Sequence, residues 1–159
     1  MLRQAVFFLI LVGTPLASAS VYGQMSGTLN GAQEYRENQD IQQMEPDQKA
    51  FQGFTHANGQ MTILEGGFYY IYAQVFFEPY FNTRGTRYNR VALVVQSDTT
   101  FSLMQFNQDS RNPQGRAGSS FTGGIIQLSS GDKIYLKAVY RSALFVGGAH
   151  TFFGAYKLN

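Results

Sequence analysis

Few side chains in this sequence could do chemistry. The chain has 159 residues, no cysteine and only two histidines, His56 and His150. Thiol catalysis and thiolate metal sites are therefore excluded, and two separated histidines fall short of the three or four ligands of a zinc site. Ser129-Ser130-Gly131-Asp132 places hydroxyls near a carboxylate, but no nucleophile elbow accompanies it, and a turn between strands explains it better. The glycines form neither a dinucleotide fingerprint nor a phosphate loop. We expect a protein that is not an enzyme, with no catalytic residue, metal site or cofactor.

The charge balance is nearly neutral. Twelve Lys and Arg against ten Asp and Glu give a formal charge of +2, which is too small to indicate nucleic-acid binding. Some arginines could form a basic patch for an acidic receptor surface or a sulfated glycan, although scattered, solvated side chains explain them too. These arginines are Arg84, Arg87, Arg90, Arg111 and Arg116.

The N-terminus indicates the compartment. A short basic start, Met1-Leu2-Arg3, precedes an apolar run over residues 5–16 and the small residues Ala17-Ser18-Ala19. This is the pattern of a secretory signal peptide, so we expect residues 1–19 to be removed and the mature chain to be extracellular from Ser20. The alternative is an uncut signal anchor, which would make a type II membrane protein.

The rest of the chain, residues 20–159, predicts one all-β domain. Aromatic residues reach 15% and there are 17 glycines, a composition typical of strands joined by tight turns. Residues 21–28 predict a first strand, and the polar stretch 30–48 predicts a long surface loop. Short strands separated by turn signals indicate a sandwich or jelly roll. They are predicted at residues 51–55, 61–64, 68–77, 90–96, 101–106, 120–128, 133–140 and 149–158.

The strand predicted at 68–77 is apolar on both faces. Tyr69, Ile71 and Val75 would lie on one face, and Phe68, Tyr70 and the other even-numbered residues on the opposite one. An antiparallel strand with one solvated face alternates apolar with polar residues, so this strand should be covered twice. The second sheet can cover one face, and a neighbouring subunit is the simplest cover for the other. A crowded single-chain core is the alternative. Residues 121–128 and 151–158 repeat the pattern.

Three segments carry a family resemblance. Residues 63–77, ILEGGFYYIYAQVFF, resemble the signature of the tumour necrosis factor ligand family, although Met61 stands where that family usually has Leu or Val. Residues 121–128 and the following Ser130-Gly131-Asp132 resemble the family's Gly-Gly strand and Gly-Asp turn. Residues 150–155 resemble its closing strand, especially that of ectodysplasin-like members. The resemblance covers roughly residues 21–158.

The resemblance implies a ten-stranded jelly-roll sandwich of two antiparallel sheets that forms a homotrimer. It places aromatic residues on the three-fold axis at Tyr72, Phe121 and Phe152. The predicted trimer interface comprises Tyr70, Tyr72, Gln74, Phe121, Phe152 and Tyr156.

The resemblance also implies a cysteine-rich receptor that docks in grooves between protomers. The predicted contacts are Asp98, Thr99, Thr100, Arg141, Leu144 and Phe145. Leu144 and Phe145 beside Arg141, in an expected connection between strands, have the composition of an interface hot spot. They could equally extend a strand into the core.

The predicted function is that of a secreted trimeric cytokine that binds and clusters receptors of the tumour necrosis factor receptor family. The chain departs from the family in two ways. Many members have a disulfide between surface loops, whereas this chain has no cysteine. Most members have a membrane span followed by a stalk, whereas here the predicted domain begins directly after residue 19. The alternative function is a recognition module resembling the globular head of complement's first component. That family usually has a collagen stem, and no Gly-X-Y repeat occurs here.

Overall fold

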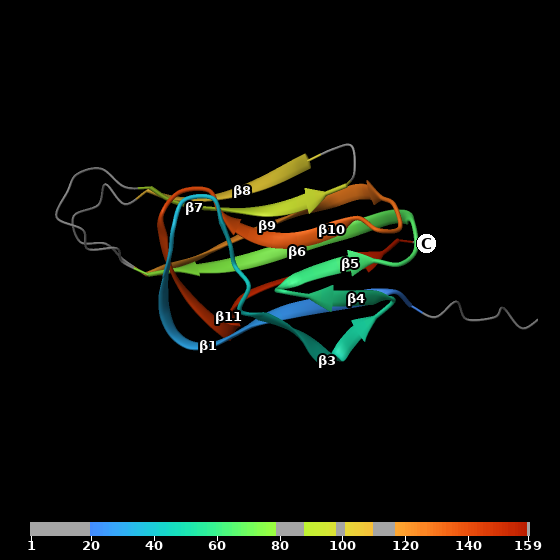
Figure 1. Ribbon diagram of the computed structural model, residues 1–159, viewed down its shortest axis with the longest axis horizontal. Helices are drawn as coiled ribbons and strands as arrows, with labels where there is room; N and C mark the ends of the chain where they lie inside the picture. The colour runs from blue at the N-terminus through green and yellow to red at the C-terminus, as the bar shows by residue number, and fades with distance from the viewer. Residues whose placement is uncertain (1–19, 79–87, 98–100, 110–116, 159) are drawn as a thin grey trace, which may run out of the picture.

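Antiparallel strands make up most of the chain that the structure describes. The computed structural model describes residues 20–78, 88–97, 101–109 and 117–158 (Figure 1). Within these ranges there are eleven strands, of which β2 has two residues. They are β1 (Tyr22–Tyr35), β2 (Gln39–Asp40), β3 (Met44–Gln52), β4 (Phe54–Ala57), β5 (Gln60–Ile63), β6 (Gly67–Phe77), β7 (Tyr88–Gln96), β8 (Phe101–Asp109), β9 (Gly118–Leu128), β10 (Lys133–Ala138) and β11 (Ser142–Lys157).

The strands form two sheets that lie against one another as layers (Figure 1). One sheet has the order β3-β1-β11-β6-β9, and the other has the order β4-β5-β10-β7-β8 with β2 beside β10. The prediction of an all-β sandwich of two antiparallel sheets is confirmed. Between the layers lies one hydrophobic core, whose largest fully buried side chains include Tyr35, Tyr69, Phe77 and Phe153.

Strand β6 shows why the core lies where it does. Its odd-numbered side chains from Tyr69 to Phe77 are at most 1% exposed. Its even-numbered side chains face away from the second sheet and are only half-buried or exposed. Because successive side chains of a strand point to opposite faces, the strand's second apolar face is left on the outside of the five-stranded sheet.

The prediction of a long loop over residues 30–48 is wrong. Strand β1 continues to Tyr35 and pairs with β11 from Tyr22 opposite Tyr156 to Tyr35 opposite Ser142. Main-chain groups make the hydrogen bonds of this ladder, so its polar side chains do not prevent the pairing. The stretch is fixed to the core by its three large apolar residues, because Tyr35, Ile41 and Met44 are each at most 1% exposed.

The connection expected near residues 141–148 is also a strand. Strand β11 begins at Ser142 and includes Gly147 and Gly148, which we expected to separate two strands. Its register with β6 shifts between Leu144, opposite Phe77, and Phe152, opposite Gln74. This irregularity lets one long strand contain glycines that resemble a turn signal in the sequence.

Two predicted turns are confirmed in detail. Asn58 and Gly59 have φ values of 51° and 73°, as expected for the two-residue turn of a hairpin such as β4–β5. In the turn between β9 and β10, Gly131 has a φ of 94°, and the Ser129 N–H donates to Asp132 Oδ2 at 2.8 Å. The carboxylate that the sequence placed near two serine hydroxyls therefore closes a turn.

Both ends of the described chain lie at the same end of the sandwich (Figure 1). There the Lys157 N–H donates to the Val21 carbonyl oxygen at 2.9 Å. Because β1 and β11 are antiparallel, the last residues of β1 and the first residues of β11 meet at the opposite end.

Replacing Gly59 with Ala should lower the free energy of unfolding by at least about 1 kcal/mol, because its positive φ is unfavourable for an L side chain. In addition, a Cβ there would lie 2.7 Å from the Ile41 carbonyl oxygen and from Gln42 Cα. Urea denaturation measures the change. Gly31→Ala is the control, since a Cβ at Gly31 meets nothing within 4 Å. Equal urea midpoints for Gly59→Ala and Gly31→Ala would contradict the role of Gly59 in the turn.

Candidate functional site

The outer side of the five-stranded sheet carries apolar side chains that no described part of the chain covers. The most exposed residues are Ile125 at 65%, Phe121 at 58% and Phe68 at 55%. We call this surface the aromatic face. Its members are Tyr22, Phe68, Tyr70, Tyr72, Phe76, Phe121, Ile125, Phe152 and Tyr156. A contiguous apolar surface of this kind marks an interaction site in a soluble protein.

Strand register brings the predicted interface residues onto this one face. Gln74 on β6 is opposite Phe152 on β11 and Phe121 on β9. Tyr70 is opposite Tyr156, and their ring centroids are 5.4 Å apart. The residues share a face because they lie at alternate positions of neighbouring antiparallel strands. The structure thus places them together, and their burial in an interface stays a prediction.

Glycines allow two of the tyrosines to lie across the sheet. Tyr72 is opposite Gly154, where a Cβ would lie 2.5 Å from the Tyr72 hydroxyl oxygen. A Cβ at Gly123 would lie 2.6 Å from the hydroxyl oxygen of Tyr70. The rings therefore occupy space above the glycines, and this close approach requires that the neighbouring strands have no side chain there.

The polar atoms at the centre of the aromatic face are bonded within the chain. The Tyr72 hydroxyl donates to Gln24 Oε1 at 3.1 Å, and Gln74 Nε2 donates to the His150 carbonyl oxygen at 3.2 Å. Burial and, to a smaller extent, the neighbouring Tyr156 raise the pKa of Tyr72. Because these donors already have acceptors, covering the face would leave few polar groups unsatisfied.

The aromatic face carries no formal charge on its central strands. The outward positions are 68, 70, 72, 74 and 76 on β6, 119, 121, 123, 125 and 127 on β9, and 150, 152, 154 and 156 on β11. None of them is Asp, Glu, Lys or Arg. Charged residues are similarly depleted from the cores of protein–protein interfaces.

A histidine joins two phenylalanines at one end of the aromatic face. The His150 ring centroid lies 4.7 Å from that of Phe145 and 5.3 Å from that of Phe76. The Thr151 hydroxyl donates to the Phe145 carbonyl oxygen at 2.7 Å and accepts from the Phe76 N–H at 3.1 Å. Thr151 thereby fixes the bulged part of β11 against β6.

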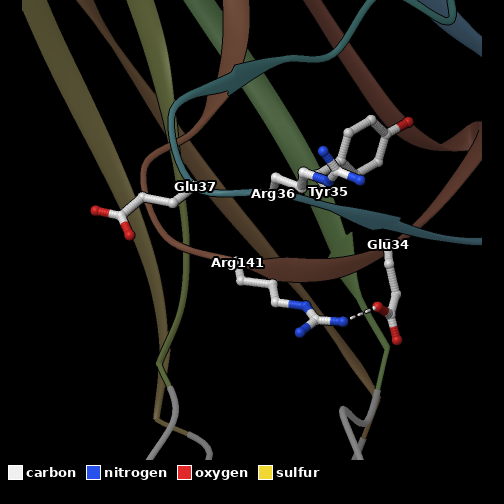
Figure 2. A pocket seen from close by; sticks show the side chains of 5 residues that line it. All are labelled: Glu34, Tyr35, Arg36, Glu37 and Arg141. Atoms are coloured by element: carbon white, nitrogen blue, oxygen red, sulfur yellow. Dashed lines mark hydrogen bonds and ion pairs between the residues drawn. The ribbon is translucent and has the colours of Figure 1, made fainter.

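A charged hollow lies at the end of the sandwich away from the chain termini. Its volume is about 590 Å³, and Glu34, Tyr35, Arg36, Glu37 and Arg141 line it. Arg141 Nη2 lies 2.8 Å from Glu34 Oε2, and both side chains are more than half exposed. Figure 2 shows this pair side by side, with Glu37 pointing away.

Tyr35 lines the hollow, and its ring points away from the Glu34–Arg141 pair (Figure 2) and belongs to the core. Its side chain is 1% exposed, and its hydroxyl donates to Gln43 Oε1 at 2.8 Å. Burial raises the pKa of Tyr35 to about 12, so the hydroxyl stays protonated and neutral through the physiological range. The hollow therefore presents exposed charges of both signs, from Glu34, Arg36, Glu37 and Arg141.

Comparison with known proteins identifies the family. The model of the TNF (tumour necrosis factor) family matches residues 45–158. The chain belongs to the TNF family. The matched region contains β6, β9 and β11, the three central strands of the aromatic face.

Two solved structures show that other proteins share this fold. Eiger TNF from S. frugiperda superposes with a TM-score of 0.74 at 14% identity, covering 88% of this chain and 93% of that one. Murine APRIL in a crystal structure at pH 5.0 gives a TM-score of 0.66 at 17% identity, covering 88% of this chain and 100% of that one. No curated protein sequence matches the chain. Identities this low show a shared fold alone.

The residues predicted to contact a TNF receptor differ in their position and exposure in the structure. Asp98, Thr99 and Thr100 lie outside the described residues. Arg141 is exposed at the charged hollow. We expected Leu144 and Phe145 to form an exposed pair in a connection between strands. This expectation is wrong for Leu144, which lies in the core and is 0% exposed. Phe145 is half-buried against His150 and Phe76. Leu144 and Phe145 both belong to β11, so neither lies in a connection.

Sequence reasoning missed Glu34, Arg36 and Glu37 as neighbours of Arg141. They lie in the polar stretch that we expected to be a loop, between 104 and 107 positions before Arg141 in the sequence. The signs of their charges alone do not indicate which residues so far apart in the sequence lie together in the fold. Only the β1–β11 register, in which Glu34 is opposite Ala143, brings them together.

The remaining polar groups show no sign of a metal site or a membrane span in the described ranges. No group of three or more His, Cys, Asp or Glu side chains gathers there. His56 lies 3.8 Å from Glu45, and both are exposed. Among the same residues, no helix is long and apolar enough to cross a membrane.

Proposed function

We propose that this protein is an extracellular cytokine of the TNF family that acts as a homotrimer and clusters cysteine-rich receptors of the TNF receptor family. It is a binding protein and performs no catalysis. The observation that carries the proposal is the uncharged aromatic face, which the described residues leave uncovered. A ligand that presents three equivalent receptor sites brings several receptors together.

The energetics favour covering the whole aromatic face. Burying one of its rings contributes about 1 kcal/mol at roughly 25 cal/mol per Å². Three rings in each of three subunits then contribute on the order of 10 kcal/mol, while association itself costs about 4–15 kcal/mol. Tyr72, Phe121 and Phe152 alone would barely offset that cost. The interface therefore has to include the other rings of the face as well.

A second copy of the chain fits this face. Its uncharged centre creates no repulsion between identical surfaces, and its central polar atoms are already bonded. Strand β9 is at the edge of the sheet and carries Phe121 and Ile125. When this edge packs on the β6–β11 surface of the next copy, the contact joins two different patches. Such a heterologous contact closes into a trimeric ring when each copy is rotated by one third of a turn from the last.

The charged hollow is the proposed receptor contact. The aromatic face is occupied by subunit contacts in this proposal, so recognition is left to the ends and edges of the rigid sandwich. The ion pair between Arg141 and Glu34 is exposed and therefore contributes little to stability. Both groups, and Arg36 beside them, are exposed where a receptor can reach them. Asp98, Thr99 and Thr100, proposed from the sequence, stay a separate proposed contact. Leu144 is not proposed again because it is buried.

Secretion is the proposed route out of the cell, with the uncut type II anchor as the alternative. The pattern of residues 1–19 supports it, and the globular-head alternative loses support because residues 45–158 match the TNF family. The hollow lies away from the end where Val21 enters the sheet. A membrane at that end would therefore leave the proposed receptor site accessible.

Phe121→Asp should convert the trimer to monomers that remain folded. The ring is 58% exposed in the single chain, so the fold depends on it little, whereas one unpaired charge buried in an interface costs several kcal/mol. Sedimentation velocity measures the mass, and circular dichroism checks the fold. Leu64→Asp is the matched control, because Leu64 is 52% exposed and lies outside the face. A trimer that persists in Phe121→Asp would exclude β9 from the interface.

Arg141→Ala should weaken receptor binding at least tenfold and leave the melting temperature of the trimer almost unchanged. A hot-spot contact is worth about 2 kcal/mol, and an exposed ion pair at most about 1 kcal/mol. Surface plasmon resonance against a panel of cysteine-rich receptor ectodomains gives the affinity. Lys49→Ala, exposed on β3 away from the hollow, is the control. If both variants bind like the wild type, the receptor contacts other residues.

Cells that express the full chain should release a protein whose first residue is Ser20. The small residues at positions 17 and 19 fit the peptidase that removes signal peptides. N-terminal sequencing of the released protein tests the cleavage site. Recovery of the intact N-terminus from the membrane fraction would instead establish the anchored form.

A further inference from the structure

We infer that His150 makes the assembly of this protein acid-sensitive, so that the trimer weakens as the pH falls from neutral to the range of acidic compartments. The inference deepens the proposed function and rests on it, because it concerns the regulation of the proposed trimer. It starts from the position of the one histidine on the aromatic face.

His150 lies at the margin of the predicted interface. It occupies the outward position two residues before Phe152 on β11, and its carbonyl oxygen accepts from Gln74 Nε2. Its ring packs edge-on against Phe76, at an interplanar angle of 88°, and is tilted by 57° against Phe145. A subunit that covers Phe152 and Gln74 therefore also restricts the access of water to this imidazole.

No acidic side chain forms an ion pair with His150 among the described residues. On β6 it faces Gln74 and Phe76, and beyond them β9 presents Phe121 and Ser119. Glu78 follows just after β6, where its main-chain N–H donates to the Ala143 carbonyl oxygen, and it forms no ion pair with His150. On β1 the residue opposite Phe152 is Ser26.

The carboxylates of the adjoining strands have other partners. Glu45, opposite Ser26 on β3, lies 3.8 Å from His56. Glu34, on the part of β1 that pairs with β11 near Phe145, is bonded to Arg141. The other titratable groups of the face are tyrosines, and the pKa of Tyr72 is raised, so none of them gains charge in acid.

His150 is therefore the group through which acid would change the charge of the aromatic face. Histidine is the side chain that becomes charged between about pH 8 and pH 5. In the free chain His150 is exposed, and water solvates the imidazolium. In the assembly the same charge would lie between two phenyl rings and a second apolar surface, where losing its hydration is costly. Assembly consequently requires the neutral imidazole and releases a proton from any protonated His150.

Symmetry multiplies the effect. Each trimer contains three copies of His150, and each proton that assembly has to release lowers the association constant about tenfold per pH unit in acid. Three copies give up to about 1000-fold in the association constant. A single histidine per chain thus suffices for a steep response.

The test is sedimentation velocity of the protein, as cells release it, at about pH 7.5 and about pH 5.5. Concentration series at both values, at constant ionic strength, give the association constants. The wild type should be trimeric at neutral pH and at least tenfold weaker in acid. His150→Gln, which keeps a neutral polar side chain, should associate equally at both values. His56→Gln is the control and should behave as the wild type, because His56 lies on β4 in the other sheet.

A second measurement uses the wild type alone. The slope of the logarithm of the association constant against pH equals the number of protons released, and it should approach three between these values. A trimer unaffected by acid would overturn the role of His150 and leave the proposed trimer intact. An acid response that persists in His150→Gln would do the same. A wild type that is monomeric at neutral pH would instead overturn the proposed trimer, and this inference with it.

Discussion

The sheet formed by β3, β1, β11, β6 and β9 has two apolar sides, and it can be fully removed from water only if both sides are covered. Tyr69, Ile71 and Val75 meet the second sheet and are completely buried. The even-numbered rings of β6 have no such partner among the described residues. This difference divides the described part of the molecule into a core that the two sheets complete and a face that they leave exposed. The proposed trimer follows from that division.

The details of the aromatic face suit assembly better than exposure to solvent. Gly123 and Gly154 give Tyr70 and Tyr72 room to lie across the sheet, and the hydroxyl of Tyr72 is satisfied by Gln24. An isolated sheet face gains little from such an arrangement, whereas an interface gains packing without unsatisfied donors. The cost of this uncharged surface is sensitivity to any charge placed on it, and His150 is the one group on its central strands that acquires charge in acid.

Much of this architecture could be predicted from local patterns. Because side-chain direction in a strand has a period of two, residues 68–77 predicted one face in the core, which Tyr69, Ile71 and Val75 confirm. The cover predicted for the opposite face stays a prediction. Asn58-Gly59 and Ser130-Gly131-Asp132 predicted turns because their backbone conformations favour these residues. The family resemblance rested on the same segments, and the TNF family match over residues 45–158 confirms it.

The failures share a physical cause. Residues 30–35 are polar and Gly147-Gly148 resembles a turn, yet both segments pair with distant partners through main-chain hydrogen bonds that carry no sequence signal. The same cause hid the charged hollow, whose Glu34 and Arg141 meet only through the β1–β11 register. It also misplaced Leu144, since a continuous β11 directs this side chain into the core.

Hydroxyl-radical footprinting of the wild-type protein tests the central claim most directly, because it reports which side chains water reaches. If other copies cover the aromatic face, Phe121 and Ile125 should be protected from oxidation although they are 58% and 65% exposed in the single chain. Tyr140, at 40% exposure and outside the face, should react freely. Phe121 and Ile125 reacting in proportion to their exposure in the single chain would show that the face is open to solvent, and the proposed trimer would be wrong.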